Sequence, residues 1–543
     1  MLSRRQFIIR SGSAGAVLIV APQTALESLA APRGAATRLL RGGKFSQGVL
    51  SGDPTPRGIT LLTVLDNVSG SGSVRLEVAR DSDFRHVVAR KEIATSGGRG
   101  HSVKARVGKL KPDERYWYRF ETRDKHSPVG RFQTSLPADS KQPVKFAFFS
   151  CAEYTHGYYN AYDVMQRDDV DFVVCLGDYI YAEAYHSKAG GTAVRDDGVG
   201  QPNPQETSFV REALTLDEYR AKYALYRSDS ALRKLHARFP MISIWDDHEV
   251  QDNYAGGDSA GGLPASKRYS AARRQAGYKA YFESMPFFAQ GSNRIYRSER
   301  HGRNVDLILL DQRQYRADQP CGDAVAAPCP EWNQPRPFLG RGQMDWLKKR
   351  LSSSKATWKV IGSQTMLMPA KVTGGAFFQF DSWQGYPQER EELLQHIKTK
   401  GIDDVVFITG DIHLFLAGDV RTNMGDGESV AVEFVGGSIT STNFGEMNVP
   451  AGGGVVIPGN DANPHTDPGI INALRSINPW IDQADFDHHG YALVTASRSA
   501  FDCTLRRVET IKQRSRKVLT SNGYRYRLAR GQKSIKGVNG PPA

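Results

Sequence analysis

The segment Phe172-Val173-Val174-Cys175-Leu176-Gly177-Asp178-Tyr179-Ile180-Tyr181 joins an apolar run to a glycine and a group of possible ligands. A continuous apolar run of this length is typical of a β-strand that is buried on both faces of its sheet. In α/β folds, ligand sites lie at the carboxyl ends of such strands. The segment therefore predicts a buried strand that leads directly into a site containing Asp178 and Tyr181.

The same arrangement occurs at other places along the chain. Each is an apolar run followed at once by residues that can bind metal or phosphate, and together they are spread from residue 150 to residue 413. One such segment is weak support for a site, whereas several at predicted strand ends favour a shared centre. The segments are Ser150-Cys151, Trp245-Asp246-Asp247-His248-Glu249 and Gly410-Asp411-Ile412-His413.

Helical patterns alternate with apolar runs through this region, and such alternation is typical of an α/β domain. Thr215 and Glu218 have the spacing of a capping box, which predicts a helix that begins there. Other helical patterns cover residues 266–283, 342–351 and 389–398. Strands are predicted at residues 146–149, 172–176, 241–245, 305–310, 358–361 and 405–408.

The N-terminal part of the chain has a different pattern. Between Phe45 and Phe132, short segments alternate apolar and polar residues, which predicts half-buried antiparallel strands. Residues 110–120 are similar to the turn and late strand of a fibronectin type III sandwich. Few metal-ligand types gather here, so we expect a packing module, joined by a polar linker at residues 136–143 to the α/β domain.

The first thirty residues have the pattern of an export signal. Ser3-Arg4-Arg5-Gln6-Phe7 precedes a short apolar stretch, and Ser28-Leu29-Ala30 supplies the small residues of a cleavage site. The paired arginines resemble a twin-arginine signal, which is typical of proteins exported in folded form. We expect the mature chain to begin near Ala31 and to act outside the cytoplasmic membrane, in the periplasm or beyond. It has no apolar run of about 20 residues, so no membrane-spanning segment is expected.

The 543-residue chain has a formal net charge of +13, and part of the excess lies near its C-terminus. A basic block without acids usually forms a solvated tail, so residues 511–543 are predicted to be one. The alternative is contact with an anionic surface or with nucleic acid, the latter as substrate only. The basic residues are Lys512, Arg514, Arg516, Lys517, Arg525, Arg527, Arg530, Lys533 and Lys536.

The chain has five cysteines, so at least one is unpaired within the monomer. Cys321 and Cys329 enclose a short loop and could form a disulfide in an oxidising compartment. Cys151, at a predicted strand end, is a candidate metal ligand, with a small buried apolar role as the alternative.

The ligand types suggest two unlike metal ions. Carboxylates suit hard ions, while imidazole and thiolate suit softer transition metals. Two nearby metals can hold both the attacking and the leaving oxygen of an in-line displacement and activate a water near neutral pH. Structural roles remain the alternative for each residue taken alone. Further histidines are available as ligands: His156, His186, His488 and His489.

Taken together, these segments resemble the PhoD-type alkaline phosphatases, a branch of the calcineurin-like metallophosphoesterases. The resemblance covers nearly the whole chain except the basic tail. It implies an α/β fold, a four-layer αββα metallophosphatase sandwich at residues 143–510, preceded by a small all-β fibronectin III-like domain at residues 40–137. Besides the strand-end segments, it rests on Tyr219-Arg220 through Tyr226-Arg227, residues 311–316, 342–347 and 381–386.

The resemblance also implies the metals and their ligands. Fe³⁺ would be bound by Cys151, Asp178, Tyr181 and His413, and Asp178 would bridge to Ca²⁺. Asp247 and Asp411, which would approach that Ca²⁺, replace neutral ligands of the wider superfamily with carboxylates, as a harder ion prefers. Asp246 and Asn253 are further candidate ligands.

The implied reaction is hydrolysis of phosphate esters by in-line attack of a metal-held hydroxide. His248 is a candidate for orienting the phosphate or protonating the leaving oxygen, and Arg227 for neutralising phosphoryl charge. A structural ion pair is the alternative for Arg227. Two other readings compete: a phospholipase D or a nucleic-acid or teichoic-acid phosphodiesterase on the same scaffold, and a non-catalytic secreted adhesion protein. The expected partners are a phosphate-ester substrate and the twin-arginine export machinery.

Overall fold

The computed structural model describes residues 38–185, 193–202, 209–256, 258–259, 270–289, 291, 293–322, 325–446, 449–451, 455–457, 468–520 and 522–535. The predicted signal at residues 1–30 and the candidate ligand His186 lie outside this part of the chain. No helix within it is long and apolar enough to cross a membrane.

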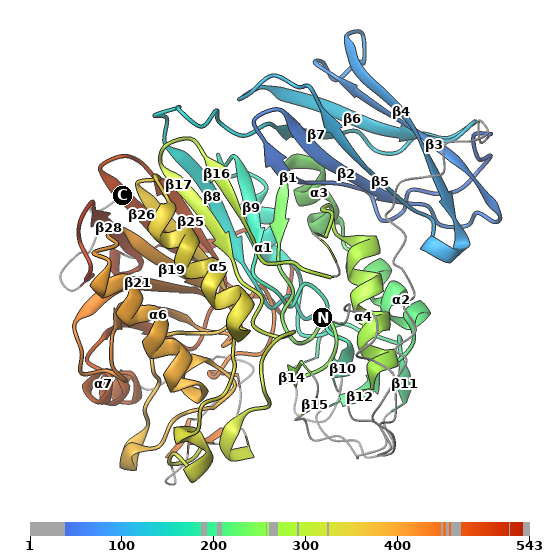
Figure 1. The fold of residues 1–543 in the computed structure, drawn as a ribbon. Coiled ribbons are helices and arrows are strands. Elements are labelled where there is room, and N and C mark those ends of the chain that lie inside the picture. The colour runs from blue at the N-terminus through green and yellow to red at the C-terminus, as the bar shows by residue number, and fades with distance from the viewer. Residues whose placement is uncertain are drawn as a thin grey trace, which may run out of the picture. The chain divides into compact units, whose positions relative to one another are not determined.

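Two large β-sheets form the framework (Figure 1). The first has ten strands in the order β27-β26-β25-β8-β9-β13-β1-β2-β5, with β28 also paired to β26. Neighbours β8, β9 and β13 run parallel, so their carboxyl ends lie at one edge of the sheet. The bounds are β1 (Val49–Thr55), β2 (Gly58–Val64), β5 (Ser102–Gly108), β8 (Val144–Phe149), β9 (Phe172–Cys175), β13 (Met241–Ser243), β25 (His489–Ala496), β26 (Ala500–Val508), β27 (Val518–Leu519) and β28 (Arg525–Ala529).

The second sheet has seven strands in the order β16-β17-β18-β19-β21-β20-β24. Its central strands β17, β18, β19 and β21 are parallel. The first three lie at apolar runs that predict buried strands, whereas β21 was not among the strands predicted from the sequence. The bounds are β16 (Arg297–His301), β17 (Val305–Leu309), β18 (Trp358–Ser363), β19 (Val405–Thr409), β20 (Phe415–Arg421), β21 (Ser429–Gly436) and β24 (Ile481–Asp485).

Successive side chains along the strands of the second sheet point to opposite faces, so each face packs against a different layer of the fold. Leu307 and Leu309 of β17 join the core between the two sheets, whereas Ile308 joins a second core on the outer face. Helices α5 (Gly340–Ser353) and α6 (Pro387–Thr399) cover that outer face, placing Leu347 and Leu393 in the second core. On the other side, α1 (Asn160–Met165) and α3 (Ser230–Arg238) contribute to the first core. The predicted αββα order is confirmed.

The remaining helices and small sheets lie in the connections between the main strands. Thr215 and Glu218 cap α2 (Leu216–Tyr226) reciprocally, as the spacing predicts. The other helices are α4 (Ala271–Ser284) and α7 (Pro468–Ile477), and the short strands are β10 (Glu183–Tyr185), β11 (Gln201–Pro202), β12 (Phe209–Glu212), β14 (Tyr254–Ala255), β15 (Asp258–Ser259), β22 (Val449–Ala451) and β23 (Val455–Ile457).

The N-terminal region is all-β, as predicted. Its separate four-stranded sheet has the order β4-β3-β6-β7, with bounds β3 (Ser71–Ala79), β4 (Val87–Ser96), β6 (Arg115–Glu121) and β7 (Gly130–Gln133). This sheet packs through its own apolar core against β1, β2 and β5. Those three strands also extend the ten-stranded sheet, because β1 pairs in parallel with β13 at Gly52 and Met241. A Cβ at Gly52 would lie 2.5 Å from the Met241 carbonyl oxygen, so only glycine fits there.

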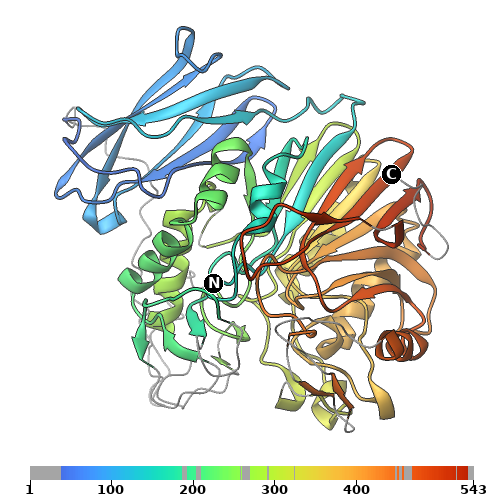
Figure 2. The same cartoon turned by 180° about the vertical axis from the view of Figure 1, so that it is seen from behind.

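The expectation of a loose basic tail at residues 511–543 is wrong for the described part up to Ile535. Strands β27 and β28 both pair with β26, and Figure 2 shows this C-terminal stretch from behind. Tyr526 and Leu528 alternate with the arginines and are buried, a period of two that marks a strand. Most of the basic side chains pair with acids elsewhere in the fold: Lys512 with Glu446, Arg516 with Asp163, Lys517 with Glu509, Arg527 with Asp502, Arg530 with Asp404 and Lys533 with Asp403.

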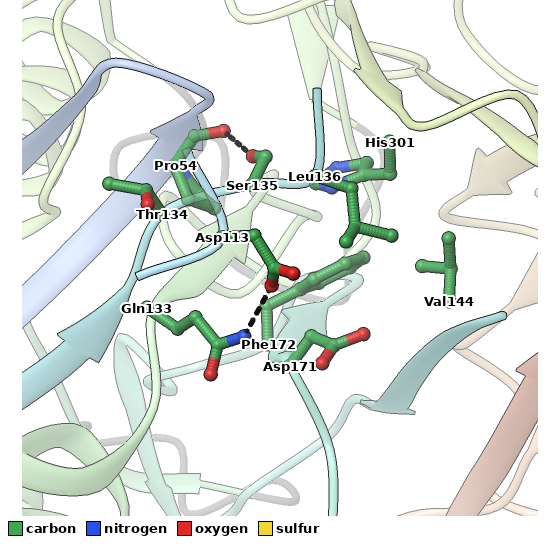
Figure 3. A pocket seen from close by; sticks show the side chains of 10 residues that line it. All are labelled: Pro54, Asp113, Gln133, Thr134, Ser135, Leu136, Val144, Asp171, Phe172 and His301. Carbon is green, nitrogen blue, oxygen red and sulfur yellow. Dashed lines mark hydrogen bonds between the residues drawn. The ribbon is translucent and has the colours of Figure 1, made fainter. Parts of the chain in front are cut away.

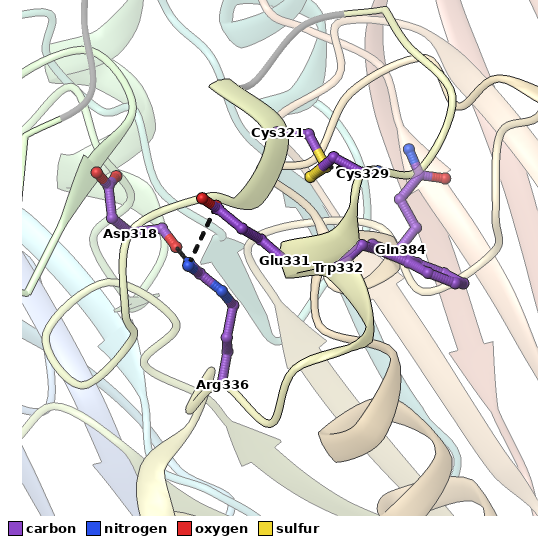
Figure 4. The surroundings of a disulfide bond; sticks show 7 residues. All are labelled: Asp318, Cys321, Cys329, Glu331, Trp332, Arg336 and Gln384. Carbon is purple, nitrogen blue, oxygen red and sulfur yellow. Dashed lines mark hydrogen bonds and ion pairs between the residues drawn. A yellow bond between two sulfur atoms is a disulfide. The ribbon is translucent and has the colours of Figure 1, made fainter.

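Cys321 and Cys329 form a disulfide, which confirms the pairing suggested by their spacing (Figure 4). Just beyond Cys329, the indole nitrogen of Trp332 donates to the Gln384 carbonyl oxygen at 2.7 Å. The other three cysteines, Cys151, Cys175 and Cys503, are unpaired and buried. Of these, only Cys151 belongs to a cluster of ligand types in the described residues.

Candidate metal centre

The four strand-end segments meet at one place. Cys151 follows β8, Asp178 follows β9 and Asp247 follows β13, while Asp411 and His413 follow β19 of the opposing sheet. Their ligand atoms form three overlapping groups, within each of which all atoms lie within 4.8 Å of one another. The groups are Cys151, Asp178 and His413; Asp178, Asp247 and His248; and Asp246, Asp247 and Asp411. The juxtaposition predicted from the sequence is therefore present.

One half of the centre combines a thiol, a phenol, an imidazole and a carboxylate. The Asp178 Oδ2 atom lies 3.4 Å from both Cys151 Sγ and Tyr181 Oη. Tyr181 Oη in turn lies 3.1 Å from His413 Nε2. Sulfur, phenolate and imidazole donors favour a transition metal over Ca²⁺ or Mg²⁺. The donor set of this half therefore fits a transition-metal ion.

Neighbouring groups aim these donors inward. His413 Nδ1 donates to the Thr442 carbonyl oxygen at 2.8 Å, so Nε2 carries the free lone pair that faces the other donors. Burial lowers the pKa of His413 to about 4, which keeps the ring neutral. Ser441 Oγ donates to Tyr181 Oη at 2.6 Å. Burial raises the pKa values of Cys151 and Tyr181 well above their usual range, so a cation is needed to hold them as anions.

The other half of the centre is a cluster of carboxylates. Burial, reinforced by neighbouring acids, raises the pKa of Asp411 well above its usual value and that of Asp246 to about 6. Asp247 Oδ2 accepts a hydrogen bond from the Asn253 backbone at 2.6 Å. Among the described residues, no hydrogen-bond partner reaches the buried Asp246 Oδ2 atom. Crowded carboxylates with an unsatisfied buried oxygen fit a hard cation that binds through oxygen.

The backbone around the ligands is strained. Cys151, Asp178, Asp411 and His413 have φ values of 58°, 52°, 68° and 57°, and Asn253 has 51°. Residues with a side chain rarely adopt this left-handed conformation, which costs about 1–3 kcal/mol each and persists where the surroundings impose it. This concentration of strain at strand ends is typical of a functional site.

His248 lies next to both halves of the centre. Its ring stacks on Tyr181 with centroids 4.0 Å apart, and Nδ1 lies 2.8 Å from a Glu183 carboxylate oxygen. Nε2 lies 3.7 Å from Asp247. Burial alone would lower the pKa of His248, but Asp247, Asp178 and Glu183 together raise it well above its usual value. These three carboxylates therefore favour the charged form of His248.

Arg227 does not reach the centre, which corrects its predicted role. Its Nε donates to Tyr179 Oη at 3.1 Å and its Nη2 to the Ser284 carbonyl oxygen at 2.6 Å. The side chain is fully buried and packs over the rings of Tyr179 and Tyr223. These contacts make Arg227 a structural residue.

The arginine that does reach the centre is Arg313, which sequence reasoning missed. It follows β17 and makes ion pairs with Asp246, Asp247, Asp381 and Asp411. Its position just beyond an apolar strand is the same signal that located the other ligand segments.

Glu249 is a second residue that sequence reasoning left without a role. Its carboxylate accepts hydrogen bonds from the backbone nitrogens of Asp178, Tyr179 and Asp246 at 3.1, 2.8 and 2.8 Å. The fully buried side chain thus fixes two ligand loops to one another.

The other candidate histidines have different partners. His156 Nδ1 accepts from the Thr442 backbone at 3.0 Å, His488 pairs with Asp485, and His489 pairs with Glu446. None of the three belongs to a ligand group of the described residues.

Comparisons with known proteins agree with the fold. The family model "PhoD-like phosphatase" matches residues 146–505, and the model of the N-terminal domain of PhoD-like phosphatases matches residues 30–136. Alkaline phosphatase D of Bacillus subtilis (strain 168) is 36% identical over 419 residues, which cover 73% of this chain and 69% of that relative. A solved structure described as "Structure of PhoD" superposes with a TM-score of 0.79 and 30% identity over 93% of each chain. The chain therefore belongs to the PhoD-like phosphatase family of phosphoric ester hydrolases.

Proposed function

We propose that this protein is an exported, metal-dependent phosphoesterase that hydrolyses phosphate monoesters, and diesters at the same centre. The observation that carries the proposal is the position of Asp178. This residue contributes to the soft group with Cys151 and His413 and to the acidic group with Asp247 and His248. One carboxylate placed between two unlike donor sets suits a pair of unlike cations.

Cys151, Asp178, Tyr181 and His413 would hold Fe³⁺, and Asp247 and Asp411, with Asp246, would hold Ca²⁺. Asn253 contributes its backbone nitrogen to Asp247, which supports an orienting role for it. When bound, the metal pair would supply an activated water and neutralise charge on the phosphoryl oxygens.

The side chains around the proposed metal pair have different roles. His248 presents a charged Nε2 toward the acidic half, where it can orient a phosphoryl oxygen or protonate the departing oxygen. Glu183 fixes the ring through Nδ1, and Tyr181 supports its face. Because these residues are buried, the imidazolium keeps one orientation.

Substrate class is tested by assaying the purified protein side by side on p-nitrophenyl phosphate, bis-p-nitrophenyl phosphate and phosphatidylcholine vesicles. We expect the monoester to be hydrolysed, with iron and calcium found by elemental analysis and a visible absorption band from ferric thiolate or phenolate. Preferential release of choline from the vesicles would favour the phospholipase D alternative. Absence of hydrolysis of all three esters by metal-replete protein would refute the phosphoesterase proposal.

Export is tested on the precursor. Replacing Arg4 and Arg5 with lysine removes the paired guanidinium groups and keeps the charge and apolar stretch of the leader. We expect the double variant to accumulate unprocessed inside the cell, whereas the wild type appears outside the cytoplasmic membrane as a shorter chain. If a strain that lacks the twin-arginine translocase exports the wild type and the double variant equally, the twin-arginine route is contradicted.

A further inference from the structure

Arg313 links the two sheets across the centre. It follows β17 of the seven-stranded sheet, yet its guanidinium contacts Asp246 and Asp247, which follow β13 of the ten-stranded sheet. The side chain is completely buried, so its charge must be balanced by these neighbours.

One edge of the guanidinium is fixed by a residue outside the ligand set. Arg313 Nη1 lies 2.8 Å from Asp381, within the usual range for a charge-assisted hydrogen bond. Asp381 is held in turn by Arg316, whose Nη1 donates to the Asp381 carbonyl oxygen at 2.9 Å, and by Gln319. This anchor keeps the guanidinium plane in place.

The other edge faces the candidate ligands. Arg313 Nε donates to Asp246 Oδ1, and Nη2 lies 3.2 Å from Asp247 Oδ1 and 3.3 Å from Asp411 Oδ1. The Nη2 contacts are longer than a typical charge-assisted pair, which leaves these oxygens able to approach another cation. Any metal ion bound by Asp247 and Asp411 must share them with a fixed positive charge a few ångströms away.

We propose that Arg313 is an internal counter-cation of the centre, a positioning residue that shares Asp246, Asp247 and Asp411 with the oxygen-bound metal ion and thereby weakens its binding. The proposal rests on the proposed function, since it assumes that a hard cation binds at the acidic half. It assigns Arg313 a role opposite in sign to that of a ligand, because its removal strengthens metal binding.

The test is a calorimetric titration with Ca²⁺ of protein that retains iron and has been treated with a calcium chelator. In Arg313→Gln the competing charge is lost, and we expect the Kd for Ca²⁺ to fall at least tenfold relative to the wild type. The melting temperature of the calcium-depleted variant should fall, because its buried carboxylates lose a counter-charge, and the rise on adding Ca²⁺ should be larger.

Arg297→Gln is the matched control, since Arg297 is a buried arginine that pairs with Asp53 and Glu299 and forms no ion pair with Asp246, Asp247 or Asp411 among the described residues. Its Kd for Ca²⁺ should stay within twofold of the wild type. Arg313→Lys, which keeps a charge in smaller form, should give an intermediate Kd and preserves the test if the glutamine variant does not fold.

Unchanged or weaker Ca²⁺ binding in both Arg313 variants would overturn the inference while leaving the proposed function intact. A wild type that hydrolyses p-nitrophenyl phosphate but binds no Ca²⁺ would also overturn it. A wild type that neither hydrolyses phosphate esters nor binds Ca²⁺ would instead refute the proposed function itself.

Discussion

Replacing Asp178 with asparagine is expected to lower kcat for p-nitrophenyl phosphate by at least about 10³-fold, equivalent to about 4 kcal/mol. Asp178 Oδ2 faces Cys151 and Tyr181, and Oδ1 accepts from the His248 backbone at 3.4 Å. An amide keeps the shape but cannot serve two cations as a shared anion, so iron content should fall together with activity.

The variant should remain folded. Burial and the neighbouring Asp247 raise the pKa of Asp178 well above its usual value. Without a cation, burying the neutral amide of asparagine therefore destabilises the fold no more than burying the Asp178 carboxyl group. We expect the metal-depleted variant to melt at or above the temperature of the metal-depleted wild type. If the variant loses metal and activity but stays stable, Asp178 is a metal ligand and not a residue that the fold needs.

Asp171→Asn is the matched control for this experiment. Asp171 precedes β9 as Asp178 follows it, and lines a pocket with Gln133, Phe172 and His301 at the opposite end of that strand (Figure 3). Its Oδ2 accepts from the Lys145 backbone at 2.9 Å. We expect full iron content and wild-type kcat. Wild-type hydrolysis with unaltered metal content in Asp178→Asn would contradict the assignment.

Replacing His248 with asparagine should lower hydrolysis by about 10²–10⁴-fold, the range for loss of a positioned general acid. The loss should be larger for an alkyl phosphate than for p-nitrophenyl phosphate, because an alkoxide needs a proton to depart and p-nitrophenolate does not. Initial rates on both esters measure this difference. His301→Asn, a buried histidine far from the ligands, should change neither rate.

The pH dependence distinguishes an acid from a purely orienting residue. Glu183 is not a candidate metal ligand, so its contribution to the raised pKa of His248 remains when metal ions bind, and the imidazolium charge is lost as pH rises through the folded pKa. Glu183→Gln removes an adjacent anion, so the pKa of His248 should fall and the alkaline limb of kcat/KM for the alkyl ester should move to lower pH. Equal loss on both esters and an unmoved limb would contradict the general-acid role.

The sequence predicted the parts of the centre that follow a local rule. Apolar runs such as Phe172 to Leu176 mark strands buried on both faces, and the residues just beyond them meet because parallel strands end at a common edge. The helix after Thr215 is predicted for a similarly local reason, because both side chains of its capping box lie within four consecutive residues.

What could not be predicted depends on partners distant in the chain. Arg227 and Arg313 both lie in segments that carry the resemblance to the family, yet only the fold places one against Tyr179 and the other against the carboxylates. The fate of the basic C-terminal segment also depends on distant acids, such as Glu446 and Asp404, that pair with its charges. Local composition predicts a solvated tail because the acids that pair with these basic residues lie far away in the sequence.

Anomalous X-ray diffraction from crystals of the protein, measured on both sides of the iron absorption edge, tests the central claim most directly. The account predicts an anomalous peak within bonding distance of His413 Nε2 and Cys151 Sγ, with Asp178 and Tyr181 also in contact with it. Density for a second, lighter ion should lie among Asp247 and Asp411. Iron-replete crystals with no peak among these side chains would contradict the account.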